Sequence, residues 1–443
     1  MHGARAGTRV WSQLLSSPVS AAALWVARGA ALVVYVAVLS LRGGPISASN
    51  DALVITLPTT AVSEGHLRLA EQETQTADPP GYALLASPLV AGLRPWLGAP
   101  RWCSDRPVPA VIAHSPQAAF YRSVLHLCAD QRPGRRGALP PWWRSQALIG
   151  VGAWLVLLFG IQWLLRAVYG RPSAAELTAA LALAVLPAAS DALIESFHPQ
   201  DLLSLGLAVM ALSQALRRRW VATGALLGLA VVCHQLAVLV LLPVIAAAPD
   251  LRSRGRLVGA ALTAGLAVTV PFLVADPSGT WSALTGTYSQ GAGIVRSSTA
   301  VGLLGVGESL KLKIARDLPV VLDALVCLIA WWRLRQRLLA PMPLLALSLV
   351  CLSSRLVFEV SVQEYYFLGV AVLLLALELT AGRPPVWALV WVVATRYGVV
   401  ELPSVTSPGW VAVAFMASAL AAMAAGVVTL AAPVAMDHRQ MES

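Results

Sequence analysis

The sequence predicts an all-α integral membrane protein, a bundle of helices that crosses the bilayer about 12 times, within a range of about 10 to 13. Of its 443 residues, 57% are hydrophobic and only 12% are charged, whereas soluble domains carry about 25% charged residues. The apolar residues are gathered into long runs, and one helical crossing needs roughly 20 of them. Residues 1–443 are therefore interpreted as a single integral membrane domain.

The predicted crossings are the apolar runs, which polar or basic segments separate. These runs cover residues 20–41, 146–168, 173–193, 201–216, 220–233, 236–249, 257–275, 318–334, 340–354, 364–381, 385–400 and 409–432. The first run contains Arg28 and is longer than the apolar region of a typical signal peptide, so we expect an uncleaved first helix.

The arginines predict the orientation of the chain. They flank the short runs 220–233 and 236–249 on both sides. A helix hairpin over 220–249 places both clusters on one side, which the positive-inside rule identifies as cytoplasmic. A cell-membrane protein with both termini in the cytoplasm is then expected. The net charge of +10 is interpreted as a consequence of this topology and not as nucleic-acid binding.

Two long segments are predicted to be extracytoplasmic: a large first loop, 42–145, and a second loop, 276–317. Within the first loop, residues 81–98 are apolar and interrupted by prolines, which suits the membrane interface. Cys103 and Cys128 share this loop, and an oxidising compartment would favour a disulfide between them. The sequence leaves this pairing open because it supplies no geometry.

The other three cysteines lie in or beside apolar runs. They are Cys233, Cys327 and Cys351. Free cysteine in such a setting behaves as a small hydrophobic residue, so we expect these side chains to be buried.

Ionisable and polar residues gather at the predicted outer face, where burial makes them costly and therefore functional candidates. These candidates are Asp51, His198, Asp201, His234, Gln235, Tyr288, Arg296, Arg355 and Glu364. A carboxylate after the first helix suits a general base that deprotonates a hydroxyl group. A helix N-terminus with an imidazole beside it suits a phosphate group.

Structural interpretations stay open beside these functional ones. The pair Asn50-Asp51 is typical of a turn, and the segment His198–Asp201 is typical of a helix N-terminus. A histidine in an apolar hairpin, such as His234, is usually a core residue. Glu364 with the two tyrosines after it is typical of an interfacial aromatic belt.

Three stretches resemble the glycosyltransferase-C superfamily, in particular the actinobacterial membrane mannosyltransferases that use polyprenyl-phosphate mannose. They are Asn50-Asp51, the Pro-Pro segment Asp78–Pro88, and His198–Asp201 followed by a helix, a basic turn and the run Trp220–Gln235. The resemblance is good over residues 195–250, weaker over 45–90 and topological elsewhere. His234 departs from the family, which usually has lysine at that position.

This resemblance implies an enzyme that moves a sugar, mannose or another pentose or hexose, from polyprenyl phosphate to a cell-envelope lipid or glycan. Asp51 is the implied base of a single inverting displacement on the extracytoplasmic side. The departing lipid phosphate would be stabilised by Arg296, Arg355 and one of the two histidines. No cofactor is required, because phosphate is an acceptable leaving group, and the sequence leaves a divalent metal open.

Two other functions fit the same composition. A lipid or solute transporter, such as a flippase, would show internal symmetry and ionisable residues inside its helices, of which Asp323 is the clearest. A non-catalytic scaffold would bind cell-envelope partners through its large outer loop. The absence of nucleotide-binding, zinc-protease and serine-hydrolase motifs gives no support to ATP-driven transport or common hydrolase chemistry.

Overall fold

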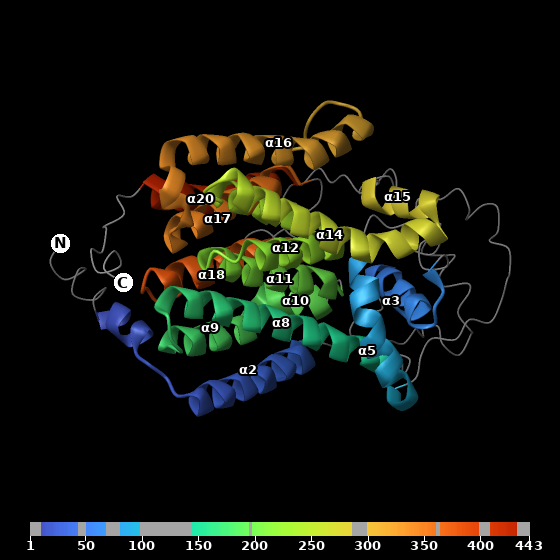
Figure 1. The fold of residues 1–443 in the computed structure, drawn as a ribbon, viewed down its shortest axis with the longest axis horizontal. Coiled ribbons are helices and arrows are strands. Elements are labelled where there is room, and N and C mark those ends of the chain that lie inside the picture. The colour runs from blue at the N-terminus through green and yellow to red at the C-terminus, as the bar shows by residue number, and fades with distance from the viewer. Residues whose placement is uncertain are drawn as a thin grey trace.

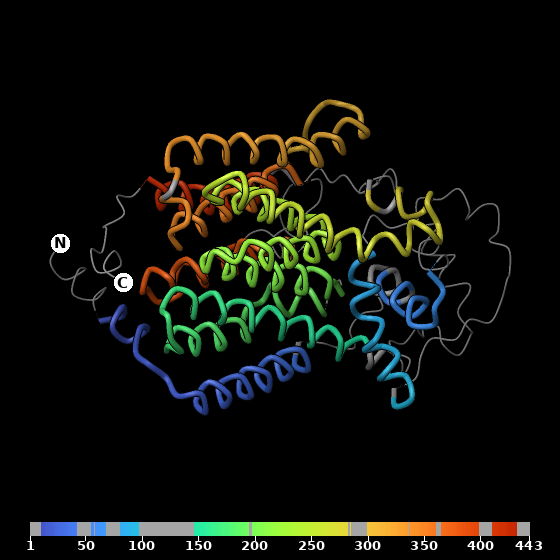
Figure 2. Tube along the Cα trace, in the orientation of Figure 1, coloured from blue at the N-terminus to red at the C-terminus, as the bar shows by residue number. Residues whose placement is uncertain are grey.

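The computed structural model describes residues 10–42, 50–67, 80–97, 143–194, 197–285, 299–359, 364–397 and 408–431. Within these ranges the regular structure is helical, apart from one isolated bridge between Pro18 and Ser173. The helices of the bundle lie side by side and roughly along the long axis of the molecule (Figures 1 and 2). The predicted all-α class is therefore confirmed for the described residues.

Each apolar run of the sequence coincides with one helix or with two consecutive helical segments. In chain order these are α2 (Ala21–Arg42), α8 (Trp143–Tyr169), α9 (Ala174–Val185) with α10 (Pro187–Ile194), α11 (Pro199–Leu216), α12 (Trp220–Cys233), η2 (Gln235–Ala237) with α13 (Val238–Ala247), α14 (Leu251–Ala275), α16 (Glu308–Leu334) followed by η3 (Arg335–Leu339), α17 (Pro341–Val357), η4 (Glu364–Phe367) with α18 (Leu368–Thr380), α19 (Val386–Thr395) and α20 (Pro408–Ala431).

Not every helix is long enough to cross a bilayer by itself. In the described part of the chain, four helices meet the requirements of length and apolarity, namely α2, α8, α14 and α20. The pair α9 and α10, bent by 44° at its break, would be a fifth span if counted as one. A helical membrane protein is therefore supported, whereas the expected number of crossings stays a prediction.

The first outer segment contains helices that the sequence did not predict. Within 42–145, α3 covers Asn50–Ser63 and α5 covers Gly81–Leu97. The two helices pack on each other and on Phe272, near the end of α14. Prolines inside both helices concealed them in the sequence, because proline normally interrupts a helix. The pair Asn50-Asp51 accordingly lies at the start of a helix.

Close packing fixes α5 against the bundle. A Cβ atom added to Gly81 would overlap the backbone carbonyl of Val232, next to the last residue of α12. Only glycine therefore permits this approach of the first turn of α5 to α12. The contact places the first turn of α5 beside the end of α12 from which His234 follows.

Glycines also let α12 and α14 touch backbone to backbone. A Cβ atom on Gly224 or Gly228 would overlap a carbonyl oxygen of α14, at Leu257 or Ala261 respectively. Small residues spaced in this way determine helix pairing in membranes, where close van der Waals packing replaces the hydrophobic effect between helices.

Replacing Gly228 with alanine should therefore destabilise the protein, because the added methyl group forces the two helices apart. Overpacking of this kind costs about 1–3 kcal/mol. Gly259→Ala on α14 is the matched control, since a Cβ atom there meets nothing within 4 Å, and its effect should stay below about 1 kcal/mol. Thermal unfolding in detergent would measure both. Equal midpoints for the two variants would contradict the close helix contact.

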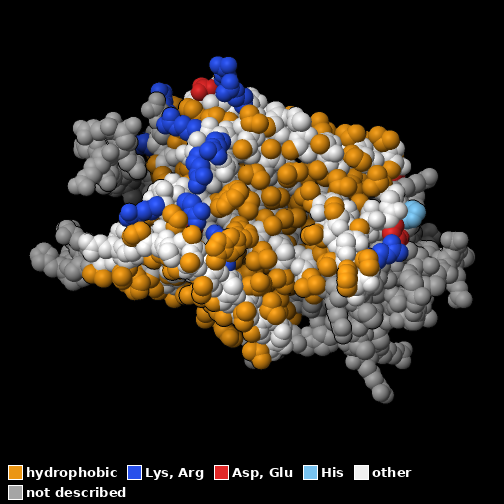
Figure 3. All heavy atoms as spheres, turned by 60° about the horizontal axis from the view of Figure 1, so that its bottom comes forward, with side chains coloured by type: hydrophobic (Ala, Val, Ile, Leu, Met, Phe, Trp, Pro, Cys, Tyr) orange, Lys and Arg blue, Asp and Glu red, His pale blue; other side chains and the backbone are white. Residues whose placement is uncertain are grey.

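One end of the bundle collects the arginines, as the face drawn in Figure 3 shows. They occur in the turns and helix ends that meet there: Arg166, Arg171, Arg217, Arg218, Arg219, Arg252, Arg254, Arg256, Arg333, Arg335, Arg337 and Arg383. The Tyr169 hydroxyl donates to the Leu379 carbonyl, and Arg171 donates to the Ser16 carbonyl, which confirms that these helix ends are neighbours. Such a basic end is expected of a cytoplasmic face.

At this end Asp250 caps α14. Its carboxylate accepts hydrogen bonds from the backbone N–H of Ser253 at 2.7 Å and from the Ser253 hydroxyl at 3.2 Å. The bond from the backbone N–H lowers the pKa of Asp250, because it stabilises the charged form.

A carboxyl group whose pKa falls on folding stabilises the protein above its unfolded pKa, and this contribution is lost as the pH falls through the folded pKa. Asp250→Ala should therefore lower the unfolding temperature at neutral pH. The difference from wild type should shrink below about pH 4. Thermal unfolding of both proteins across pH 3 to 7 would measure this difference. A difference that does not change with pH would contradict the capping role.

Candidate functional site

A cavity of about 260 Å³ lies where α11, α13, α16, α17 and η4 meet. From this cavity α11 runs to the arginine turn at 217–219, and α12 returns from that turn, so the cavity is at the end opposite the arginines. Its polar lining consists of His198, His234, Gln235, Arg316, Arg355 and Glu359. The rest of the lining is apolar or aromatic: Leu236, Val238, Leu239, Pro319, Val320, Tyr365 and Tyr366.

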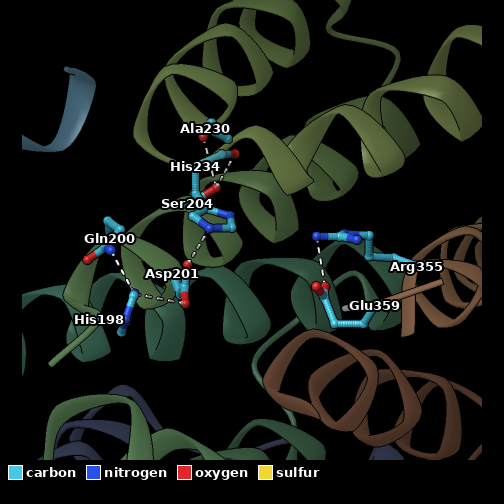
Figure 4. A network of polar contacts seen from close by, with 8 residues as sticks. All are labelled: His198, Gln200, Asp201, Ser204, Ala230, His234, Arg355 and Glu359. Carbon is cyan, nitrogen blue, oxygen red and sulfur yellow. Dashed lines mark hydrogen bonds and ion pairs between the residues drawn. The ribbon is translucent and has the colours of Figure 1, made fainter. Parts of the chain in front are cut away.

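Asp201 connects two histidines at one side of this cavity (Figure 4). Its Oδ1 lies 3.1 Å from Nε2 of His234, and its Oδ2 lies 3.8 Å from Nδ1 of His198. Only the first distance is short, and a carboxylate oxygen at that separation favours a proton on Nε2 of His234, which leaves Nδ1 of that ring as an acceptor. At His198, the amide nitrogen of Gln200 lies 2.8 Å from Nδ1, which favours a proton on Nε2 of this ring.

The backbone before α11 places His198. Phe197 is fully buried and has a φ of 50°, in the left-handed region that non-glycine residues rarely adopt. The N–H of His198 donates to the carbonyl of Ala192 in α10, and Pro199 begins α11 in the position where proline is favoured. His198 is the N-cap residue of α11, but its side chain makes no capping hydrogen bond. The imidazole instead lines the cavity.

His234 lies at a break between helices. α12 ends at Cys233, and His234 is extended, with φ of −155° and ψ of 124°. Ser204 of α11 donates to the carbonyl of Ala230 at 2.8 Å and lies 3.4 Å from the carbonyl of His234. These contacts satisfy carbonyl groups that the ending helix leaves without partners. The break coincides with the turn that the sequence predicted at 233–235.

Arg355 and Glu359 form an ion pair at the other side of the cavity (Figure 4). One guanidinium nitrogen of Arg355 lies 2.7 Å from the Glu359 carboxylate, and another donates to the Ala315 carbonyl at 3.1 Å. The two side chains are 12% and 2% exposed. The pair is therefore largely removed from water, where charge interactions are strong.

Aromatic rings close the cavity near His198. The Tyr365 ring stacks on His198 with centroids 4.0 Å apart and planes inclined by 17°. Tyr366 contacts Tyr365 edge to face, at 4.7 Å between centroids. Tyr365 is buried, so its interpretation as part of an exposed aromatic belt is wrong.

Arg316 lies towards the mouth of the cavity and forms an ion pair with its neighbour Asp317. Its Nε lies 2.7 Å from the Asp317 carboxylate, and the two side chains are 44% and 56% exposed. The hydrogen bond from Arg316 lowers the pKa of Asp317, since it favours the carboxylate. An exposed pair of this kind contributes little to stability.

The structure brings five of the predicted residues together around the cavity: His198, Asp201, His234, Gln235 and Arg355. Asp51 lies in α3 and Glu364 in η4, but their side chains lie outside the described part. Tyr288, Arg296, Cys103 and Cys128 also lie outside the described residues.

Three lining residues were absent from the predicted site: Arg316, Glu359 and Tyr365. The spacing of Arg355 and Glu359, four residues apart, was the sequence signal for their ion pair. Arg316 gave no such signal. Within the described ranges, no group of three or more His, Cys, Asp or Glu side chains is arranged to hold a metal ion.

Comparisons with known proteins do not assign the chain to a family. No protein-family model matches it, and no curated protein is significantly similar to it. The function has therefore to be argued from the chemistry of the site.

Proposed function

We propose that the protein is a membrane glycosyltransferase that uses a polyprenyl-phosphate sugar as its donor and a lipid or glycan of the cell envelope as its acceptor. The observation that carries this proposal is the single cavity in which Arg355, His198 and His234 lie beside an apolar wall. An amphiphile with an anionic headgroup suits this combination of side chains. The reaction takes place on the extracytoplasmic side of the cell membrane, opposite the arginine end.

The donor phosphate binds between Arg355 and the histidines. Arginine presents several N–H donors in a plane that matches phosphate oxygens, and the Nε2 proton of His198 is a further donor. Leu236, Val238 and Val320 belong to the apolar wall, which suits the first part of an isoprenoid chain. Negative charge grows on the phosphate as the sugar leaves, and the positioned donors stabilise that charge.

Asp51 is the proposed general base. It accepts the proton of the acceptor hydroxyl, whose oxygen attacks the anomeric carbon while the bond to the lipid phosphate breaks. The contact of Gly81 with Val232 supports this assignment, since it holds the α3–α5 pair against the end of α12 beside His234. The role of Asp51 rests on this arrangement of helices and on the sequence resemblance.

A lipid or solute transporter is the second candidate, and one observation favours it. Asp323 is 1% exposed inside α16, where its carboxylate accepts a hydrogen bond from Ser354 of α17. Buried ionisable groups of this kind mark transport pathways in many membrane proteins. More charged side chains line the cavity than contact Asp323. We therefore place the transferase first.

A transfer assay in membranes tests the proposal, with radiolabelled polyprenyl-phosphate mannose as donor. Wild type should label a lipid or polysaccharide acceptor, and Asp51→Asn at matched expression should lose activity by about 100-fold or more. Asp250→Asn, at the arginine end, is the matched control and should keep full activity. Equal labelling by wild type and Asp51→Asn would reject Asp51 as the base. No labelling by any of the three proteins would reject the transferase with this donor.

A further inference from the structure

A narrow stripe of residues attaches α16 to the rest of the protein. Its buried residues are Ala315, Pro319, Asp323, Cys327 and Ala330, each about one turn from the next. Apolar residues on its other faces are exposed, Leu328 at 56% for example, and α16 lies along the outer edge of the bundle (Figure 1). A few contacts with α13 and α17 therefore hold α16 in place.

Two of these contacts are chemically unusual. The Sγ atoms of Cys327 on α16 and Cys351 on α17 are 3.7 Å apart, and both side chains are buried. One turn away, the Ser354 hydroxyl lies 2.7 and 2.9 Å from the two carboxylate oxygens of Asp323. This polar contact fixes the register of the two helices, so the two sulfur atoms stay opposite each other. A disulfide has a separation of about 2.05 Å, so the two sulfur atoms are in contact but not bonded.

We propose that Cys327 and Cys351 are a redox-active thiol pair that forms a disulfide between α16 and α17. The co-reactant is a lipid-soluble quinone. Each thiol gives up one proton and one electron, the S–S bond forms, and the quinone takes up both protons and both electrons to become the hydroquinone.

The position of the pair decides the class of oxidant. Cys351 is ten residues from the start of α17 at Pro341, which corresponds to about 15 Å along the helix. In a helix that begins at the membrane surface, this distance leads to the middle of a hydrocarbon core about 30 Å thick. Leu328, which follows Cys327 in the sequence, is 56% exposed, as suits an apolar helix face in contact with lipid. An oxidant dissolved in the bilayer therefore reaches this pair more readily than one dissolved in water.

The disulfide would fasten two walls of the cavity to each other. Arg316, Pro319 and Val320 belong to α16, whereas Arg355 lies at the end of α17. The disulfide would join these walls by a covalent bond. In the reduced protein, only noncovalent contacts such as the one between Asp323 and Ser354 join them. This inference concerns thiol chemistry alone and does not depend on the proposed function.

Mass spectrometry of the full-length wild-type protein in lipid nanodiscs tests the pair. Cys327 and Cys351 fall in different tryptic peptides, 317–333 and 338–355. After treatment with duroquinone, a fully substituted quinone, these peptides should be recovered as one linked species. Reduction with dithiothreitol should separate them again. The variant Cys351→Ser should yield no linked species.

Counting the free thiols after the folded protein has been oxidised provides an independent measurement. In a variant with Cys103, Cys128 and Cys233 replaced by serine, maleimide labelling after denaturation should fall from two thiols to none on oxidation. Copper–phenanthroline serves as a second, stronger oxidant that does not depend on the reactivity of a quinone. Two free thiols and no linked peptide after both oxidants, in protein that stays monodisperse, would overturn the proposal. A linked peptide with copper–phenanthroline alone would overturn the quinone as co-reactant.

Discussion

Replacing Arg355 with glutamine should lower the rate of sugar transfer by about 100- to 1,000-fold, the usual effect of removing one preorganised donor from a developing anion. The guanidinium is held by Glu359 and by the Ala315 carbonyl, so its donors are already oriented before the substrate arrives. Glutamine keeps two N–H donors but loses the charge. Initial rates at saturating donor, at matched expression, would measure the loss.

A second variant separates this catalytic effect from misfolding. Arg355→Gln leaves Glu359 buried without its cation, and such a change destabilises a protein by about 3–5 kcal/mol. The double variant Arg355→Gln with Glu359→Gln removes both charges and should recover most of the stability but none of the activity. Activity that returns with the double variant would show that Arg355 has only a structural role.

Asp201→Asn should lower the transfer rate by about 100-fold, which is the scale of a misoriented acid–base side chain. The Asp201 carboxylate lies 3.1 Å from Nε2 of His234 and offers that ring only an acceptor. An amide offers both a donor and an acceptor, so the proton position and the orientation of the ring are no longer fixed. Asp250→Asn again serves as the matched control, because it makes the same replacement at the other end of the bundle.

Asp201 is a positioning residue, and a double-mutant cycle with His234→Gln tests this role. If Asp201 acts through His234, the double variant should be no slower than the slower single variant, since coupled residues are not additive. Losses that multiply in the double variant would show that the two side chains act independently. The same cycle measured on thermal stability would show whether the coupling is confined to activity.

The sequence predicted the helical class and most helix positions, because a membrane imposes a length and an apolar composition on every crossing. The break at His234 was also predictable, since arginine clusters on both sides of 220–249 required the chain to turn. Ionisable residues at the outer helix ends identified His198, Asp201 and Arg355 as candidates before any contact was known. Burying an ionisable side chain costs free energy, and such residues can be recognised from their type and from the apolar runs beside them.

The remaining features depend on which helices are neighbours, and the sequence does not record that. The sequence did not predict α3, because Pro58 lies inside it. For its first residues, Asn50 and Asp51, a turn and a catalytic site were both left open. Glu359 became a site residue only because α17 ends beside the cavity. Cys327 and Cys351 were correctly predicted to be buried, but their contact follows from the register of α16 against α17.

Photolabelling tests most directly whether the cavity is the donor site. A polyprenyl-phosphate analogue with a diazirine on its first isoprene unit would be irradiated with the protein in nanodiscs, and the labelled peptides would be mapped. We expect label on Gln235–Leu239 and on Arg316–Val320, and its loss on addition of unlabelled polyprenyl phosphate or in the Arg355→Gln, Glu359→Gln variant. Label spread over the lipid-facing sides of α2 and α20, unchanged by competitor or by the variant, would contradict the assignment of the cavity.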